Sequence, residues 1–169
     1  VRAAGHMGVK VLTLYAFSTE NWKRPPIEVR FLMKLFKSYL ISQLRELVED
    51  NVQVHIVGEP SALSDDLRKE IAACEKDTAK CDGMILNVAI NYGGRQAIVR
   101  AAQQLPQKAA EGTLNPADIT EDMLSDYMFT RGQKDPDFIL RPTGEQRLSN
   151  FMMWQAAFSE LVEMTVMRP

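Results

Sequence analysis

The sequence has 169 residues, and its 20 lysines and arginines nearly balance its 22 aspartates and glutamates, for a net charge of -2. This length is typical of one domain with a sizeable core, and we expect a single domain over residues 1–169. The charge balance argues against a nucleic-acid partner, because proteins that coat polyanions are usually more basic. None of the apolar runs approaches the roughly 18 residues of a membrane-spanning helix.

Two cysteines, Cys74 and Cys81, fall about two turns apart on a predicted helix, too far from each other for a disulfide. No other cysteine or histidine clusters around them, so a structural zinc site is not expected. Reduced thiols of this kind are typical of the cytosol, and we expect a cytoplasmic protein.

The chain begins with residues that resemble the last turns of a helix ending at Gly8. A helix that joins two parallel strands is longer than this and follows a strand. We therefore expect a further strand and its loop upstream of Val1.

Short apolar runs alternate with longer segments of helical spacing. The expected strands are residues 9–17, 52–57, 84–90, 138–140 and 162–166. The expected helices are residues 27–50, 63–79, 95–111 and a short one at 121–128 that Thr120 would cap. Strands and helices that alternate in this way predict an α/β fold, with a parallel sheet flanked by helices.

The long helix at residues 27–50 has apolar residues around most of its circumference. Such a helix is usually buried between a sheet and a second neighbour. The alternative is that one of its faces lines an oily cavity next to a polar site. The sequence leaves both interpretations open.

Polar residues follow the first and third strands, at the carboxyl ends where open parallel sheets bind ligands. After the first strand come Ser18, Asn21, Trp22 and Arg24, which could form a site or could simply close a turn while Trp22 packs on the core. After the third strand come Asn91, Gly93, Gly94 and Arg95. Paired glycines at the start of a helix open a backbone cradle for an anion, although a plain tight turn explains them nearly as well.

The segment at residues 137–160 contains the strongest signal for phosphate chemistry. Arg141 and Arg147 surround a turn at Thr143 and Gly144, and Ser149 follows. The guanidinium fork matches phosphate oxygens, and a glycine lets backbone amides approach them. Glu160 comes later as a carboxylate that could hold a divalent cation. An exposed loop with solvated arginines is the alternative, but three strand ends with similar chemistry favour a site.

Three segments in order resemble those of a known family: TLYAFSTENWKRP at residues 13–25, LNVAINYGGR at 86–95 and DPDFILRPTGEQRLSNFMMWQAAFSEL at 135–161. Together they resemble the cis-prenyltransferases, the family of undecaprenyl and decaprenyl diphosphate synthases. The resemblance implies a Rossmann-like parallel sheet of about six strands and a homodimer. It also implies Mg2+-dependent condensation of isopentenyl diphosphate with an allylic diphosphate such as farnesyl diphosphate. The polyprenyl product could attach the protein to the membrane surface.

The resemblance also implies roles for individual residues. Arg141, Arg147 and Ser149 match the residues that hold isopentenyl diphosphate, and Glu160 matches the Mg2+ ligand. The mobile loop that closes over the substrates is matched by Ser18, Asn21, Trp22 and Arg24, followed by the acid Glu28. Asn21 and Arg24 are the candidate catalytic residues, and Asn91, Gly93, Gly94 and Arg95 could line the site. The resemblance does not identify the group that removes the proton from the substrate.

Two features depart from the family pattern. The family's aspartate loop, with the pattern Met-Asp-Gly-Asn-Arg-Arg-Trp-Ala, does not occur in residues 1–169, and Arg168-Pro169 stand where the family usually has Trp-Pro-Asp-Phe. We therefore expect the chain to be truncated at the N-terminus and at the C-terminal tail, and to be inactive by itself. The alternatives are a non-catalytic partner subunit of the same fold and an inactive fragment that binds diphosphates.

Overall fold

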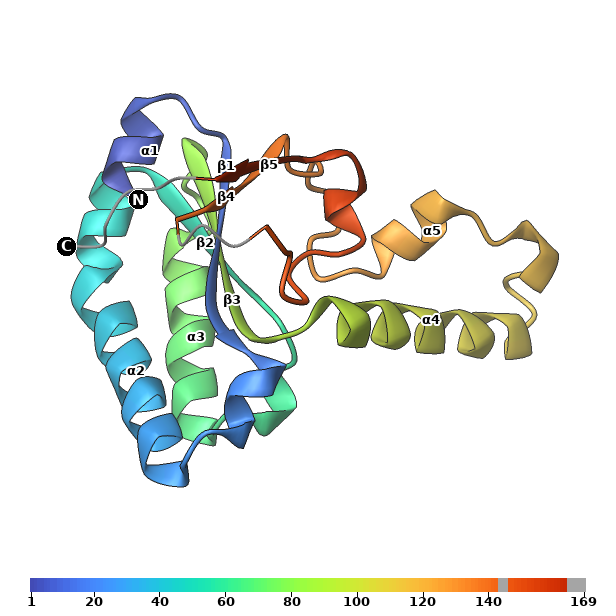
Figure 1. Cartoon of the computed structure of the whole chain (residues 1–169), viewed down its shortest axis with the longest axis horizontal. Coiled ribbons are helices and arrows are strands. Elements are labelled where there is room, and N and C mark those ends of the chain that lie inside the picture. The colour runs from blue at the N-terminus through green and yellow to red at the C-terminus, as the bar shows by residue number, and fades with distance from the viewer. Residues whose placement is uncertain (143–145, 164–169) are drawn as a thin grey trace. The chain divides into compact units, whose positions relative to one another are not determined.

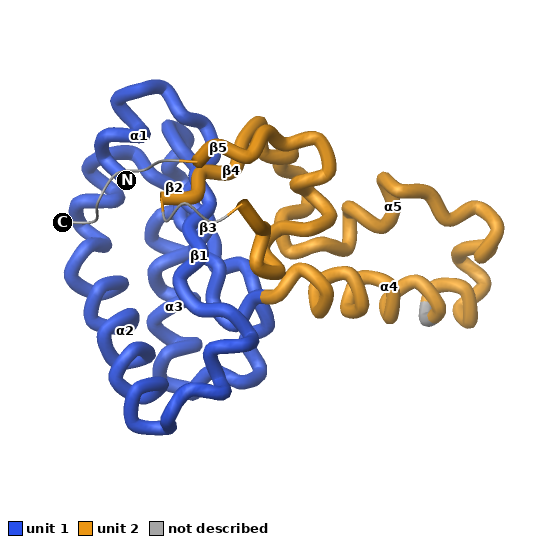
Figure 2. Tube along the Cα trace, viewed as in Figure 1, with its two compact units in different colours: residues 1–92 blue, residues 93–169 orange. Residues whose placement is uncertain are grey.

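The computed structural model describes residues 1–142 and 146–163 (Figure 1). The chain divides into two compact units, residues 1–92 and residues 93–169 (Figure 2). Each unit has its own sheet. The assignment of residues 1–169 to one domain stays a prediction. Among the described residues, no helix is both long and apolar enough to cross a membrane.

The first unit is an α/β layer structure built on a three-stranded parallel sheet with the order β1-β3-β2. Its strands are β1 (Val11–Ser18), β2 (Val52–Val57) and β3 (Met84–Tyr92). Its helices are α1 (Arg2–His6), α2 (Pro26–Glu49) and α3 (Asp65–Thr78), with short 3-10 turns η1 (Thr19–Lys23) and η2 (Pro60–Ala62). The three apolar runs thus form parallel strands, as predicted. The runs are rich in β-branched residues, which favour the pleated and half-buried surface of a strand.

Helices α2 and α3 lie side by side (Figure 1) and pack their apolar faces on the sheet. Helix α2 begins with Pro26, whose fixed backbone angle suits a first helical position. Helix α3 begins after Ser64, whose Oγ accepts the Leu67 N–H at 3.3 Å. The core contains Val29 and Leu40 of α2, which meet the apolar side chains of α3 and of the strands. This packing fixes the layer that supports the carboxyl ends of the strands.

The outer side of α2 differs from the expectation of burial on both sides. Phe31 is 63 % exposed and Tyr39 is 60 % exposed, and Ile27 and Leu35 extend the same apolar stripe. Only one face of the helix therefore contacts the core in the described part of the chain. The exposed stripe explains why its apolar pattern is too wide for one-sided burial.

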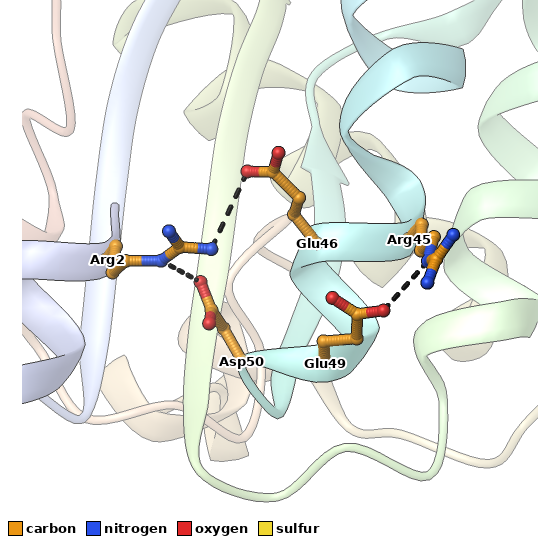
Figure 3. A network of polar contacts seen from close by, with 5 residues as sticks. All are labelled: Arg2, Arg45, Glu46, Glu49 and Asp50. Carbon is orange, nitrogen blue, oxygen red and sulfur yellow. Dashed lines mark hydrogen bonds and ion pairs between the residues drawn. The ribbon is translucent and has the colours of Figure 1, made fainter.

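Helix α1 is held at the end of α2 by ion pairs (Figure 3). The Arg2 guanidinium donates through Nε to Asp50 at 2.8 Å, and its Nη2 lies 3.6 Å from Glu46. A separate pair joins Arg45 to Glu49 on α2 at 2.8 Å. These groups are largely exposed, so each pair contributes little to stability. They orient α1, whereas apolar burial supplies most of the stability of this unit.

Side chains of α3 cover the outer edge of β2. The Val54 N–H donates to Thr78 Oγ1 at 3.1 Å, and the Ile56 N–H donates to Glu75 Oε1 at 2.8 Å. Thr78 is fully buried there. The strand N–H groups that face away from β3 are therefore satisfied by a helix.

The second unit contains helices and a small parallel pair of strands. The helices are α4 (Gly94–Ala110) and α5 (Glu121–Asp126), and the strands are β4 (Phe138–Arg141) and β5 (Glu160–Glu163). Two 3-10 turns, η3 (Pro116–Asp118) and η4 (Gln155–Phe158), complete the unit. The predicted cap of α5 is confirmed, because Thr120 Oγ1 accepts the Met123 N–H at 3.3 Å.

The last strand begins earlier than predicted. It pairs in parallel with β4 from Phe138 opposite Glu160 to Arg141 opposite Glu163. The sequence placed this strand at residues 162–166, of which residues 164–166 lie outside the described residues. The early start follows from the register, since the Glu160 N–H donates to the Asp137 carbonyl at 3.0 Å.

The described residues form one sheet of three strands and one of two, all parallel. The parallel α/β architecture is thus confirmed, but the count of about six strands in one sheet was wrong for the described residues. That count came from the family resemblance. The described residues contain five strands in all.

Candidate functional site

Beyond the end of β1, the chain turns back on itself at residues 18–24. The Ser18 N–H donates to Asn21 Oδ1 at 2.8 Å, and the Arg24 N–H donates to the Asn21 carbonyl at 3.1 Å. Asn21 therefore closes the turn with both its side chain and its backbone. The turn-forming interpretation of these residues is correct, and it gives a candidate catalytic residue a structural task as well.

Trp22 is anchored on two sides, although 37 % of it is exposed. Its ring meets the buried Phe17 ring edge to face, with centroids 5.2 Å apart. Its Nε1 donates to Asn91 Oδ1 at 2.6 Å. The structure thus joins two candidate residues that lie 69 positions apart in the sequence.

Arg24 and Glu28 form an ion pair one helical turn apart. Both side chains are about half exposed, and Glu28 lies in the first turn of α2. A carboxylate is stabilised there by the positive end of the helix dipole. The pair presents one cation and one anion directly after the turn at residues 18–24.

Asn91 joins the end of β3 to the loop that follows β2. It is only 7 % exposed and has a φ of 48°, in the left-handed region that asparagine tolerates better than most residues. Its Nδ2 donates to the Glu59 carbonyl at 2.7 Å, and the Glu59 N–H donates to the Asn91 carbonyl at 3.2 Å. The ends of β1, β2 and β3 are consequently linked through one asparagine.

Tyr15 is a residue near this edge that the sequence analysis did not select. Burial, followed by the nearby charge of Glu20, raises the pKa of its hydroxyl to about 12. The hydroxyl donates to the Tyr92 carbonyl at 3.3 Å, and the two rings meet edge to face. The only sequence signal for Tyr15 is its place on the strand just before the polar turn.

In the second unit, the start of α4 is occupied by Asn150. The Gly94 N–H donates to the Asn150 carbonyl at 2.7 Å, and the Arg95 N–H donates to Asn150 Oδ1 at 2.9 Å. A methyl group at Gly94 would lie 2.8 Å from Met153 Cγ. The sequence left an anion cradle and a plain tight turn open at Gly93, Gly94 and Arg95, and the bonded N–H groups of Gly94 and Arg95 favour the turn. The glycine serves the close approach of residues 150–153.

The same turn places Ser149 beside Arg141. Arg141 Nη2 donates to Ser149 Oγ at 3.4 Å, so two of the predicted diphosphate ligands lie together. Ser149, Asn150 and Met152 all have positive φ angles, of 51°, 63° and 43°. Non-glycine residues rarely adopt this conformation, and clusters of it often mark functional segments.

Arg147 is exposed, whereas Thr143 and Gly144 lie outside the described residues. Glu160 is exposed at the start of β5 and lines a shallow hollow of about 480 Å³. The hollow is also lined by Lys134, Asp135, Pro136, Asp137, Phe138 and Phe158. Partial burial raises the pKa of the Asp135 carboxyl. Several carboxyl groups thus surround one opening.

No group of three or more histidines, cysteines, aspartates or glutamates in the described residues is arranged to hold a metal ion. Mg2+ typically binds through one or two carboxylates and completes its shell with water and substrate phosphates. The exposed Glu160 carboxylate is chemically suited to that kind of binding.

A protein-family model described as "Putative undecaprenyl diphosphate synthase" matches residues 1–169. The chain belongs to this family. It is 54 % identical over 168 residues to an isoprenyl transferase of Bacillus subtilis, with 99 % of the chain aligned to 65 % of that protein. It is 48 % identical to an isoprenyl transferase of Geobacillus kaustophilus, with 95 % of the chain aligned to 62 % of that protein. The chain thus spans less than two thirds of the length of these relatives.

Two solved structures resemble this family member closely. One is a lavandulyl diphosphate synthase from Lavandula x intermedia in complex with dimethylallyl diphosphate, with a TM-score of 0.91 and 37 % identity. It aligns 95 % of the chain with 70 % of its own. The other is a probable undecaprenyl diphosphate synthase from Campylobacter jejuni, with a TM-score of 0.83, 34 % identity, and coverage of 95 % and 74 %. Both support the predicted family and α/β fold class.

Proposed function

We propose that the protein is a cis-prenyltransferase that condenses isopentenyl diphosphate with an allylic diphosphate to make a polyprenyl diphosphate. The observation that carries this proposal is the 54 % identity to an isoprenyl transferase over nearly the whole chain. A related solved structure holds dimethylallyl diphosphate, which is an allylic diphosphate. The pair of Arg141 and Ser149 supplies chemistry that suits such a ligand.

Isopentenyl diphosphate is the substrate that we assign to Arg141, Arg147 and Ser149. Arg141 and Ser149 are already within hydrogen-bond distance of each other. Their nitrogen and oxygen donors therefore need little movement to bind two oxygens of one diphosphate. Binding of this kind orients the alkene for attack on C1 of the allylic partner, and orientation alone can lower a barrier considerably.

The turn at residues 18–24 is assigned to the allylic partner. Arg24 offers a cation, and its pair with Glu28 limits the directions in which the guanidinium can point. Trp22 presents its ring, because its N–H is used by Asn91. Asn21 shapes the turn through its bonds to Ser18 and Arg24.

Magnesium is the cofactor that we propose, with Glu160 as a ligand. When bound, the ion would neutralise charge on a diphosphate and make it a better leaving group. The remaining proposals concern the whole protein: a homodimer, a cytoplasmic location, and contact with the membrane surface through the lipid product. The allylic substrate class rests on the related structure and on the family resemblance.

The activity can be tested with radiolabelled isopentenyl diphosphate, farnesyl diphosphate and Mg2+, using the full-length protein. Chain growth that depends on both diphosphates would support the proposal. Diphosphate binding without chain growth would refute it and indicate a non-catalytic partner subunit of the same fold.

A matched pair of variants tests the assigned arginine. Arg147→Ala should raise the KM for isopentenyl diphosphate by about 10- to 100-fold, because a charge-assisted hydrogen bond contributes about 1.5–3 kcal/mol. Arg131→Ala removes a similarly exposed arginine of the same unit that is not assigned to the site. Its KM should be unchanged, and equal effects of the two substitutions would contradict the assignment of Arg147.

A further inference from the structure

The amide of Asn91 uses both of its polar atoms to connect separate segments of the first unit. Its Oδ1 accepts the Trp22 indole N–H, and its Nδ2 donates to the Glu59 carbonyl. An indole nitrogen can only donate and a carbonyl oxygen can only accept, so the two partners fix the orientation of the amide.

The loop on the far side of Asn91 is rigidly placed against the end of β3. A methyl group at Gly58 would lie 1.8 Å from the Ile90 carbonyl oxygen, and the φ of Gly58 is 141°. Glu59 then forms two hydrogen bonds with Asn91, one from its N–H and one to its carbonyl. The loop after β2 therefore holds Asn91 in place through bonds that do not involve Trp22.

The turn at residues 18–24 depends more on Asn91 than its own bonds suggest. The short 3-10 turn η1 has no buried residue. Its long-range attachments in the described structure include the Trp22 bond to Asn91 and the contact of the Trp22 ring with Phe17. Phe17 belongs to β1 and Asn91 belongs to β3, so the bond to Asn91 ties the turn to a different strand.

We infer that Asn91 is a positioning residue that docks Trp22, and with it the turn at residues 18–24, onto the end of β3. The kinetic consequence rests on the proposed function, whereas the docking itself does not. Asn91 touches no reacting atom in this assignment. It acts by keeping the Trp22 ring and the Arg24 guanidinium in a fixed place when substrate arrives.

Docking can be measured without any substrate. Asn91→Gly removes both bonds of the amide, of which only the one to Trp22 involves the turn, and glycine tolerates the left-handed backbone. Loss of one such hydrogen bond corresponds to about a fivefold shift in the docking equilibrium. In the full-length protein, amide hydrogen exchange at residues 19–24 should accelerate about fivefold. Trp22 should become more accessible to acrylamide in a background where the other tryptophans are phenylalanine.

The matched control is Asn51→Gly. Asn51 also has a left-handed backbone, with a φ of 56°, and also bonds a neighbouring loop through its side chain. It precedes β2 and therefore lies at the amino end of that strand. Exchange at residues 19–24 and quenching of Trp22 should be unchanged in this variant. If Asn91→Gly behaves like Asn51→Gly in both measurements, the inference is wrong.

Trp22→Phe tests the same bond from the exposed side, and it gives an answer even if Asn91→Gly fails to fold. It keeps an aromatic ring against Phe17, although a smaller one, and removes the indole donor. Exchange at residues 19–24 should again accelerate about fivefold. Unchanged exchange in Trp22→Phe would overturn the inference.

The kinetic arm uses a double-mutant cycle in the full-length protein. Each substitution should lower kcat/KM for the allylic substrate about fivefold, and the double variant should lower it no further, because both break the same bond between Trp22 and Asn91. Independent effects, about 25-fold together, would refute a role through Trp22. If no chain growth occurs at all, the proposed function fails, while the exchange and quenching results still decide the docking of Trp22.

Discussion

The start of α4 offers the most direct quantitative test of how the second unit is built. Asn150 Oδ1 accepts the Arg95 N–H at 2.9 Å, and the φ of Asn150 is 63°. Asn150→Gly removes the side-chain bond to Arg95 without backbone strain and should destabilise the protein by about 1 kcal/mol. Asn150→Ala adds the strain of a left-handed alanine, about 1–2 kcal/mol more. The expected total for alanine is about 2–3 kcal/mol.

Asn150→Asp completes the series. A carboxylate still accepts the Arg95 N–H, tolerates the left-handed backbone and is favoured at a helix start, so the loss should be below about 0.5 kcal/mol. Urea unfolding of the full-length protein, followed by circular dichroism, gives the three values. Because Ser149 directly precedes Asn150, the glycine variant should also raise the KM for isopentenyl diphosphate. Equal losses for aspartate and glycine would show that the side-chain bond to Arg95 contributes nothing.

Three further outcomes are expected in the first unit. Gly58→Ala should destabilise the protein by more than about 3 kcal/mol in urea unfolding, because its methyl group would overlap the Ile90 carbonyl; a stable variant would disprove this close approach. The fold raises the pKa of Tyr15 from 10.0 to about 12, so the protonated hydroxyl contributes stability that is fully present below pH 10 and is lost as the pH rises toward 12. The free energy of unfolding should therefore fall less steeply between pH 10 and pH 12 in Tyr15→Phe than in the unmodified protein. Burial raises the pKa of Cys74 to about 11, so iodoacetamide should label this thiol only on unfolding, and rapid labelling of the native protein at pH 8 would contradict its burial.

Local patterns of the sequence predicted the elements well. The β-branched runs formed the strands, and Thr120 capped its helix as expected, because each of these signals acts within a few residues. The register of β5 was missed, because it depends on pairing with β4, more than 20 residues earlier. The type of each element could thus be predicted from nearby residues, whereas the start of β5 depends on a distant strand.

In the candidate site, too, contacts between residues close in sequence could be predicted and long-range contacts could not. The pairs Arg141 with Ser149 and Arg24 with Glu28 are close in sequence, and the structure brings each pair together. The bond between Trp22 and Asn91 spans 69 positions, so no spacing rule reveals it. Likewise, the sequence could not decide between an anion cradle and a plain turn at the start of α4, because Asn150, which accepts the Arg95 N–H, lies 55 positions away. The same residues at a helix start can bind an anion or be capped by a side chain from elsewhere, and only the fold distinguishes the two cases.

The covered edge of β2 has a consequence for how this sheet can associate. An exposed parallel edge is a template on which strands of other molecules can add and aggregate. At β2, the donors of Val54 and Ile56 are already bonded to α3, so an incoming strand would have to displace a helix. The described sheet ends at β1 on its other side. Any strand that extends the sheet is therefore directed to β1, next to the polar turn, and the molecule is protected from growing in the opposite direction.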